Sequence, residues 1–229
     1  MGQVQLYRLP LGERTSPLYA PDSPYKTIED IRNASEPPKC GSGGAAGTVS
    51  IFPGYWKTVG AKFTIVLGYQ GGGPIDLAVE KGEIHCRAMT IESFFAREPF
   101  HTWRKNNFVK SIAQSARKRD ARLPDTPTIY ELMDRYKTTD QSRRVATLIL
   151  AGGVFGRPMV GPAGIPPDRL KLLRDAFVSA VKDPELKVEA EKRNYELDPV
   201  AGEDMEKLAK EMMSQPQTVI DRMKKILGN

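Results

Sequence analysis

The sequence contains two copies of one short arrangement, in which an apolar strand runs into a glycine-rich turn and the turn leads into a helix. The successive pieces are strand 39–42, turn 41–47 and helix 48–59, followed by strand 62–69, turn 71–73 and helix 74–81. Strands that alternate with helices pair in parallel, because each helix carries the chain back to the start of the next strand. The repeat therefore predicts an α/β fold.

The rest of the chain continues this alternation. Further strands are expected at 16–20, 83–89, 108–114 and 154–160, and further helices at 27–33, 91–96, 140–151, 184–192, 202–213 and 216–227, with one starting at Asp125 or Thr126 and one within 161–183. Gly152 and Gly153 are expected to end the helix before them. The pattern predicts a parallel or mixed sheet with helices on both faces, where ligands bind beyond the carboxyl ends of the strands.

Composition limits the class of protein. The chain has 229 residues, 40% of them hydrophobic, so it can bury a core, and its two cysteines are too few for a disulfide scaffold. No apolar run approaches the roughly 18 residues of a membrane helix. The first residues lack the charged start, apolar core and cleavage site of a signal peptide. We therefore expect either a cytoplasmic protein or a chain shortened at its start.

The first glycine turn, Gly41 to Gly47, has the chemistry of an anion receptor. Its spacing is one residue off the dinucleotide fingerprint, and it lacks the lysine of a phosphate-binding P-loop. It still exposes backbone N–H groups and a hydroxyl at a helix amino terminus, which suits a carboxylate. The candidate residues are Ser42, Gly43, Gly44 and Ala45. The alternative is a tight strand-to-helix turn without a ligand.

The second glycine turn repeats this chemistry. It places Tyr69 and Gln70 beside Gly71, Gly72 and Gly73, whose missing side chains let a ligand approach the backbone. We therefore add these five residues to the candidate ligand site. The alternative for Tyr69 is a structural aromatic that covers the edge of the sheet.

The sequence offers little for catalysis, metal binding or nucleic-acid binding. His85 and Cys86 are consecutive on a strand, so they point to opposite faces and cannot share a metal or a substrate. His101 lies in a polar segment where a solvated side chain is expected. The basic stretch Arg117 to Arg122 has no interleaved aromatic residues. We expect no enzyme activity, no cofactor, no metal and no nucleic-acid partner.

Five segments stand in a recognisable order: SPYKTIEDI, CGSGGAAG, FTIVLGYQGGGPIDLAVEKGEI, ARKRDARLPDTPTIYEL and GRPMVGPAGIPPDRLKLLRDAFVSAVKDPEL. Together they resemble the tripartite tricarboxylate transporter receptors, the TctC or Bug-type solute-binding proteins. The resemblance implies a fold similar to type II periplasmic binding proteins, in which two lobes close on a small organic carboxylate. It further implies a periplasmic location and delivery of the carboxylate to the membrane subunits of a transporter.

The resemblance also implies how the chain is divided. Residues 23–151 would form a complete lobe II, and residues 1–22 and 152–229 would form the return part of lobe I without its first strands. A site with only one wall is expected to bind carboxylates weakly or not at all.

An apolar helical stripe would lose the strands that it covers and is expected to be exposed or to mediate self-association. Its residues are Leu170, Leu173, Phe177 and Val181.

The end of the third strand departs from the family pattern. Many members carry an Asp-Ser pair where this chain has Met89 and Thr90. Thr90 keeps the hydroxyl and joins the candidate ligand site, whereas Met89 removes a charge.

The rival hypothesis for the function is a small α/β enzyme that uses the same glycine turns as an anion hole. The missing nucleophile and base count against it.

The two cysteines are expected to lie side by side. Cys40 ends the first strand of lobe II and Cys86 lies in the third, and a doubly wound sheet of order 2-1-3 makes these strands neighbours. The pair then forms either a disulfide in an oxidising periplasm or two buried free thiols.

Overall fold

The computed structural model describes residues 4–9, 15–19, 23–44, 56–155, 157–162, 164–193, 197 and 199–227. The chain forms two compact units. Unit 1 comprises Met1–Gly12 and Ala151–Pro216, and unit 2 comprises Glu13–Leu150 and Gln217–Asn229. These bounds differ from the expected lobes at 13–22, at 151 and at 217–229, and the functional division into lobes stays a prediction. None of the described helices is long and apolar enough to cross a membrane.

Unit 2 is built on a mixed five-stranded sheet of order β4-β3-β5-β2-β6. Its strands are β2 (Thr15–Tyr19), β3 (Lys39–Gly41), β4 (Thr64–Val66), β5 (Cys86–Thr90) and β6 (Lys110–Ser111). Strands β4, β3 and β5 pair in parallel, while β2 runs antiparallel to β5 and β6. The predicted mixed sheet is confirmed, and so is the 2-1-3 order of its three parallel strands.

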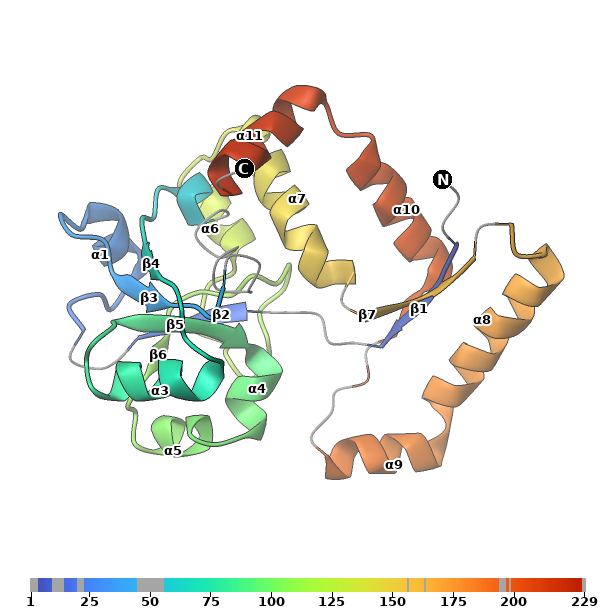
Figure 1. Ribbon diagram of the computed structural model, residues 1–229, viewed down its shortest axis with the longest axis horizontal. Helices are drawn as coiled ribbons and strands as arrows, with labels where there is room; N and C mark the ends of the chain where they lie inside the picture. Colours follow the sequence, from blue (N-terminus) through green and yellow to red (C-terminus); the bar gives the residue numbers. More distant parts are fainter. Residues whose placement is uncertain are drawn as a thin grey trace. The chain divides into compact units, whose positions relative to one another are not determined.

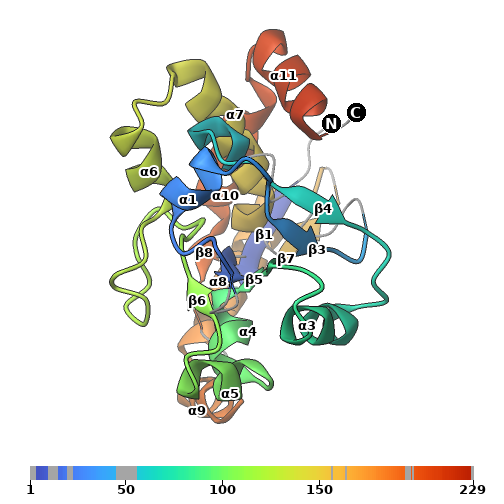
Figure 2. The same cartoon turned by 90° about the vertical axis from the view of Figure 1, so that its left-hand side faces the viewer.

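Helices cover both faces of this sheet, as predicted. Cys86 and Ala88 alternate with Arg87 and Met89 along β5, so the two pairs point to opposite faces. On one face a buried cluster joins Cys86 to α1 (Ile28–Asn33), α6 (Ile129–Arg135), α7 (Asp140–Phe155) and α11 (Gln217–Leu227). On the other face a cluster joins Met89 to α3 (Gly72–Glu80), α4 (Ile91–Ala96) and α5 (Phe100–Lys105). Figures 1 and 2 show these three helices on the side of β5 away from α1 and α6.

Two predicted helix boundaries in unit 2 are wrong, for local reasons. Helix α6 begins at Ile129 rather than at Asp125 or Thr126, because Thr128 and Glu131 form a reciprocal capping box. Helix α7 continues to Phe155, so Gly152 and Gly153 do not end it. A glycine lowers helix propensity by only about 1 kcal/mol, which the rest of a 16-residue helix can offset.

Several expected strands and helices are shorter than predicted. The strand expected at 62–69 is three residues long, and the one expected at 108–114 is two residues long, with Gln114 forming an isolated bridge to Thr128. Of the helix expected at 48–59, the described part is a short 3-10 turn, η1 (Lys57–Val59). The remainder of that prediction lies outside the described residues.

Unit 1 contains a three-stranded antiparallel sheet of order β7-β1-β8. Its strands are β1 (Val4–Leu9), β7 (Arg157–Gly161) and β8 (Val200–Ala201), and its helices are α8 (Pro167–Lys182), α9 (Pro184–Lys192) and α10 (Gly202–Met213). The predicted exposed stripe on α8 is partly wrong. Phe177 and Val181 are buried and pack with Ala201, whereas Leu173 is 44% exposed. Self-association through this stripe stays a prediction.

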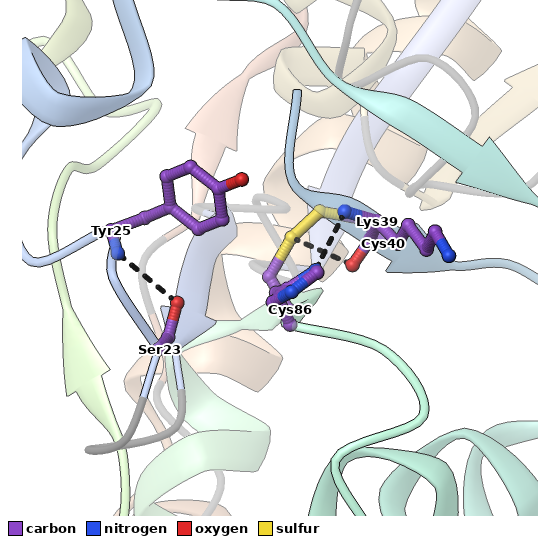
Figure 3. The surroundings of a disulfide bond; sticks show 6 residues. Ser23, Tyr25, Lys39, Cys40 and Cys86 are labelled. Atoms are coloured by element: carbon purple, nitrogen blue, oxygen red, sulfur yellow. Dashed lines mark hydrogen bonds between the residues drawn. A yellow bond between two sulfur atoms is a disulfide. The ribbon is translucent and has the colours of Figure 1, made fainter. Parts of the chain in front are cut away.

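Cys40 and Cys86 are direct neighbours on β3 and β5, with their Cα atoms 4.6 Å apart, and the structure joins them in a disulfide (Figure 3). Both cysteines are buried, at 1% and 0% exposure. The predicted adjacency is confirmed, and of the two alternatives the structure contains the disulfide. The bond fixes β3 to β5 directly before the first glycine turn.

His85, the residue before β5, is hydrogen-bonded to Lys39 at the start of β3. The backbone N–H of Lys39 donates to Nδ1 of His85 at 3.1 Å, so this nitrogen must be unprotonated. Burial lowers the pKa of His85, the charge of Lys39 lowers it further, and Glu36 opposes the shift. The unfolded chain therefore binds this proton more readily than the folded one.

We expect His85 to make stability fall in acid. Its contribution is complete above the unfolded pKa of about 6.5 and is lost as the pH falls through the lower pKa of the folded state. The His85→Asn variant keeps an acceptor without a titrating ring, so it should lose less stability between pH 7 and pH 5. Urea unfolding of both proteins across this range measures the difference. Identical pH dependence would contradict the role of His85.

Candidate functional site

The two glycine turns lie side by side at one edge of the sheet of unit 2. Strands β3 and β4 run parallel and in register up to Gly41 and Val66, so the turns that follow emerge at the same edge. The N–H of Ser42 donates to the carbonyl of Val66 at 2.8 Å. The N–H of Tyr69 donates to the carbonyl of Ser42 at 3.4 Å. These bonds hold the described part of the first turn against the second.

Gly41 makes this close approach possible. A Cβ built on Gly41 would lie 2.6 Å from Cδ1 of Ile84, 3.0 Å from Cγ2 of Ile75 and 3.1 Å from the ring of Tyr69. Carbon atoms in contact normally stand about 3.5–4.0 Å apart, so a side chain at position 41 would push its neighbours away. The absence of a side chain thus lets Tyr69 and helix α3 pack directly on the end of β3.

The second turn ends at the amino terminus of helix α3. Gly71 has φ +100° and ψ −173°, a conformation that residues with a side chain rarely adopt. No side chain caps this helix, and its first turn contains no acidic residue. The first N–H groups of a helix have no partner within it and carry a partial positive charge. This end of α3 therefore offers hydrogen-bond donors and a favourable potential to an anion.

A buried ion pair lies directly behind this turn. Arg87 on β5 is 6% exposed and Asp76 on α3 is 7% exposed, and the guanidinium donates to the carboxylate. The same Nη1 atom donates to the carbonyl of Gly72 at 3.3 Å. Burial raises the pKa of Asp76, while the charge and hydrogen bond of Arg87 act in the opposite direction. Arg87 thus ties the first turn of α3 to strand β5.

Sequence reasoning missed this pair. The available signal was an aspartate inside the apolar run Ile75–Val79 and an arginine at an otherwise apolar strand position. Buried charges are seldom tolerated unless they are paired, so each residue indicated that a partner exists. The partner itself depends on how α3 packs on β5, which a single sequence does not reveal.

The other predicted site residues have varied surroundings. Ser42 is buried and its hydroxyl donates to the carbonyl of Gly44 at 3.2 Å, while Gln70 is exposed. Tyr69 is partly buried and packs against the core cluster of α3 and α5. Thr90 accepts from the N–H of Ser93 at 3.2 Å and so caps helix α4. Ala45 lies outside the described residues.

The described residues show no group of three or more histidine, cysteine or acidic side chains arranged to hold a metal ion. The chemistry that the described turns offer is therefore hydrogen bonding from the backbone and the potential of a helix end. Both act on an anion and require no cofactor. Gly43 and Gly73 are exposed, and Gly72 is the first residue of α3.

Comparison with known proteins shows the family to which the chain belongs. The family model described as tripartite tricarboxylate transporter family receptor matches residues 11–225. The chain belongs to this receptor family. A search of curated proteins finds no match. The resemblance noted in the sequence is therefore confirmed at the level of the family, whose members are solute-binding receptors.

Solved structures of the receptor family share the fold. A TctC solute-binding protein from Polaromonas has 16% identity and a TM-score of 0.65, with 99% of this chain and 68% of that chain covered. The Rhodopseudomonas palustris protein Rpa4515, solved with adipate, has 16% identity and a TM-score of 0.59, with 99% and 69% covered. MatC from the same organism, solved with malate, has 14% identity and a TM-score of 0.54, with 98% and 69% covered.

Proposed function

We propose that this protein is a periplasmic receptor that captures a small organic carboxylate and delivers it to the membrane subunits of a tripartite tricarboxylate-type transporter. In unit 2 the carboxylate would be held by backbone N–H groups of residues 43–45 and 72–73, because the N–H groups of Ser42 and Gly71 already donate to the carbonyls of Val66 and Tyr69. Tyr69, Gln70 and Thr90 would contribute to the shape and polarity of the same wall. The observation that carries the proposal is the uncapped amino terminus of α3, held against the first glycine turn.

Two further points support a carboxylate as the ligand. Two relatives of the same fold were solved with the dicarboxylates adipate and malate. In this chain the donors at the candidate site are backbone groups, so they recognise a negative charge without depending on particular side chains. Selectivity among carboxylates would then come from the shape of the site.

Binding and turnover experiments distinguish a receptor from the rival α/β enzyme. A receptor of this chain should bind malate or adipate weakly but saturably in calorimetry, and excess ligand should raise the melting temperature. Product analysis after long incubation should find the acid unchanged. A neutral diol of the same length, at matched ionic strength, is the control and should not bind. Conversion of the acid, or equal binding of the diol, would overturn the proposal.

The Gly71→Ala variant should weaken dicarboxylate binding at least tenfold. Gly71 has φ +100°, so an alanine there would strain or rearrange the turn that presents the first N–H groups of α3. Gly82→Ala is the matched control, because Gly82 has φ +72° and lies just beyond the other end of the same helix. Both variants should lose about 1–3 kcal/mol of stability, but the control should bind within twofold of the parent. Equal loss of binding in both would show that strain alone, and not the turn, is responsible.

A further inference from the structure

A cavity of about 230 Å³ opens on unit 2 between the start of α1, strand β6, the loop before α6 and the end of α6. We call it the α1–β6 cavity. Strand register places it away from the candidate site. Lys110 on β6 lies opposite Tyr19, which in turn lies opposite Cys86 at the beginning of β5. The glycine turns and Thr90 follow the other ends of the parallel strands, so the two sites lie toward opposite edges of the sheet.

The lining of the α1–β6 cavity is predominantly cationic. Four basic side chains and two acidic ones line it, namely Lys26, Lys110, Arg119, Arg135, Glu29 and Asp125. The basic residues come from four separate segments of the chain, and the fold brings them together around one hollow. Like charges around a concave surface focus a positive potential and attract an anion.

Both arginines at this cavity are held in position by neighbours. Nε of Arg119 donates to both carboxylate oxygens of Glu131 at 3.0 Å, and its Nη1 donates to the carbonyl of Pro124 at 2.6 Å. Nη1 of Arg135 donates to Glu29 at 3.2 Å. Held guanidinium groups lose less conformational entropy when they bind an oxyanion. The arginines are therefore preorganised, although their own charges are partly compensated.

The two lysines add positive charge outside these ion pairs. Neither Lys26 nor Lys110 forms an ion pair with any residue in the described part of the chain, and both are exposed. Lys26 also interacts electrostatically with Asp30, and the two lysines beside two fixed guanidinium groups match a compact dianion. A volume of about 230 Å³ holds roughly seven waters at about 30 Å³ each, enough for a phosphate group with part of its hydration shell.

We propose that the α1–β6 cavity is a second anion site, distinct from the glycine turns, that binds a small doubly charged oxyanion of the phosphate or phosphomonoester class. Arginine forks and lysine charges are the groups that proteins use most often for phosphate oxygens. The cavity is concave and smaller than the roughly 300–1,000 Å³ of pockets for larger ligands, which favours a small anion over an extended acidic peptide.

Titration with inorganic phosphate, followed by amide NMR shifts of residues 111 and 112, tests this site directly. The parent chain should show saturable shifts at constant ionic strength. The K26Q/K110Q double variant should bind at least tenfold more weakly. The control K57Q/K62Q removes the same number of charges from exposed lysines outside the cavity, and it should bind within twofold of the parent.

Further arms of the experiment separate the possible ligands. Glycerol phosphate that competes with inorganic phosphate would identify a phosphomonoester site, and failure to compete would restrict it to the free ion. Shifts that do not saturate, or equal weakening in both double variants, would show attraction by net charge and overturn the proposal. Binding of an acidic peptide that phosphate does not displace would also overturn it. Malate titration of K26Q/K110Q tests the glycine turns separately, and its outcome does not affect this test.

Discussion

The Asp76→Ala variant should lose about 3–5 kcal/mol of its free energy of unfolding, because the substitution leaves the buried Arg87 guanidinium without its counter-charge. Both tryptophans of the chain, Trp56 and Trp103, lie in unit 2, so their fluorescence during urea unfolding reports on this unit. The same variant should weaken dicarboxylate binding, since Arg87 also bonds the carbonyl of Gly72 in the first turn of α3.

Two further variants test whether the loss of stability in Asp76→Ala comes from the burial of the ion pair. Asp140→Ala breaks an exposed pair of the same unit, formed with Arg144, whose side chains are 79% and 51% exposed, and should change stability by less than about 1 kcal/mol. Replacing both buried charges, as D76L/R87M, should recover much of the loss, since no unpaired charge remains. A loss below about 1 kcal/mol for Asp76→Ala would contradict a buried, coupled pair.

Reduction of the disulfide between Cys40 and Cys86 should lower the free energy of unfolding by about 2–4 kcal/mol. The bond closes a loop with a sequence separation of 46 residues, and such a cross-link restricts the unfolded chain. Urea unfolding followed by tryptophan fluorescence, with and without reductant, measures the difference.

The double variant C40A/C86A is the control for this experiment. It should resemble the reduced protein and should not respond further to reductant. Thiol titration of denatured, unreduced protein from an oxidising compartment should find no free thiol. Two free thiols per chain would show that the bond does not form there, and the expected stabilisation would then be absent.

Local signals in the sequence predicted much of the fold. Helices at 184–192 and 202–213 have the predicted bounds, and a capping box of Thr27 and Asp30 starts the helix expected there. Capping residues, proline and helical periodicity act over a few residues, so a single sequence reveals them. The order of the parallel strands was also predicted, because alternating strands and helices permit few arrangements.

Long-range contacts escaped prediction for a physical reason. Strand β1 was not predicted, and its pairing with β7 joins segments about 150 residues apart. The ion pair of Asp76 and Arg87 and the α1–β6 cavity likewise depend on how helices pack on strands. At the candidate site, the sequence predicted both glycine turns, but it did not predict that Arg87 ties the second of them to β5.

The central claim, that the two glycine turns of unit 2 form a carboxylate-binding wall, is tested most directly by amide NMR during a titration with malate or adipate. The account predicts that the largest saturable shifts fall on the N–H groups of residues 43–45 and 72–73, and that these shifts disappear in Gly71→Ala but persist in Gly82→Ala. Saturable shifts centred on any other part of the chain would contradict it.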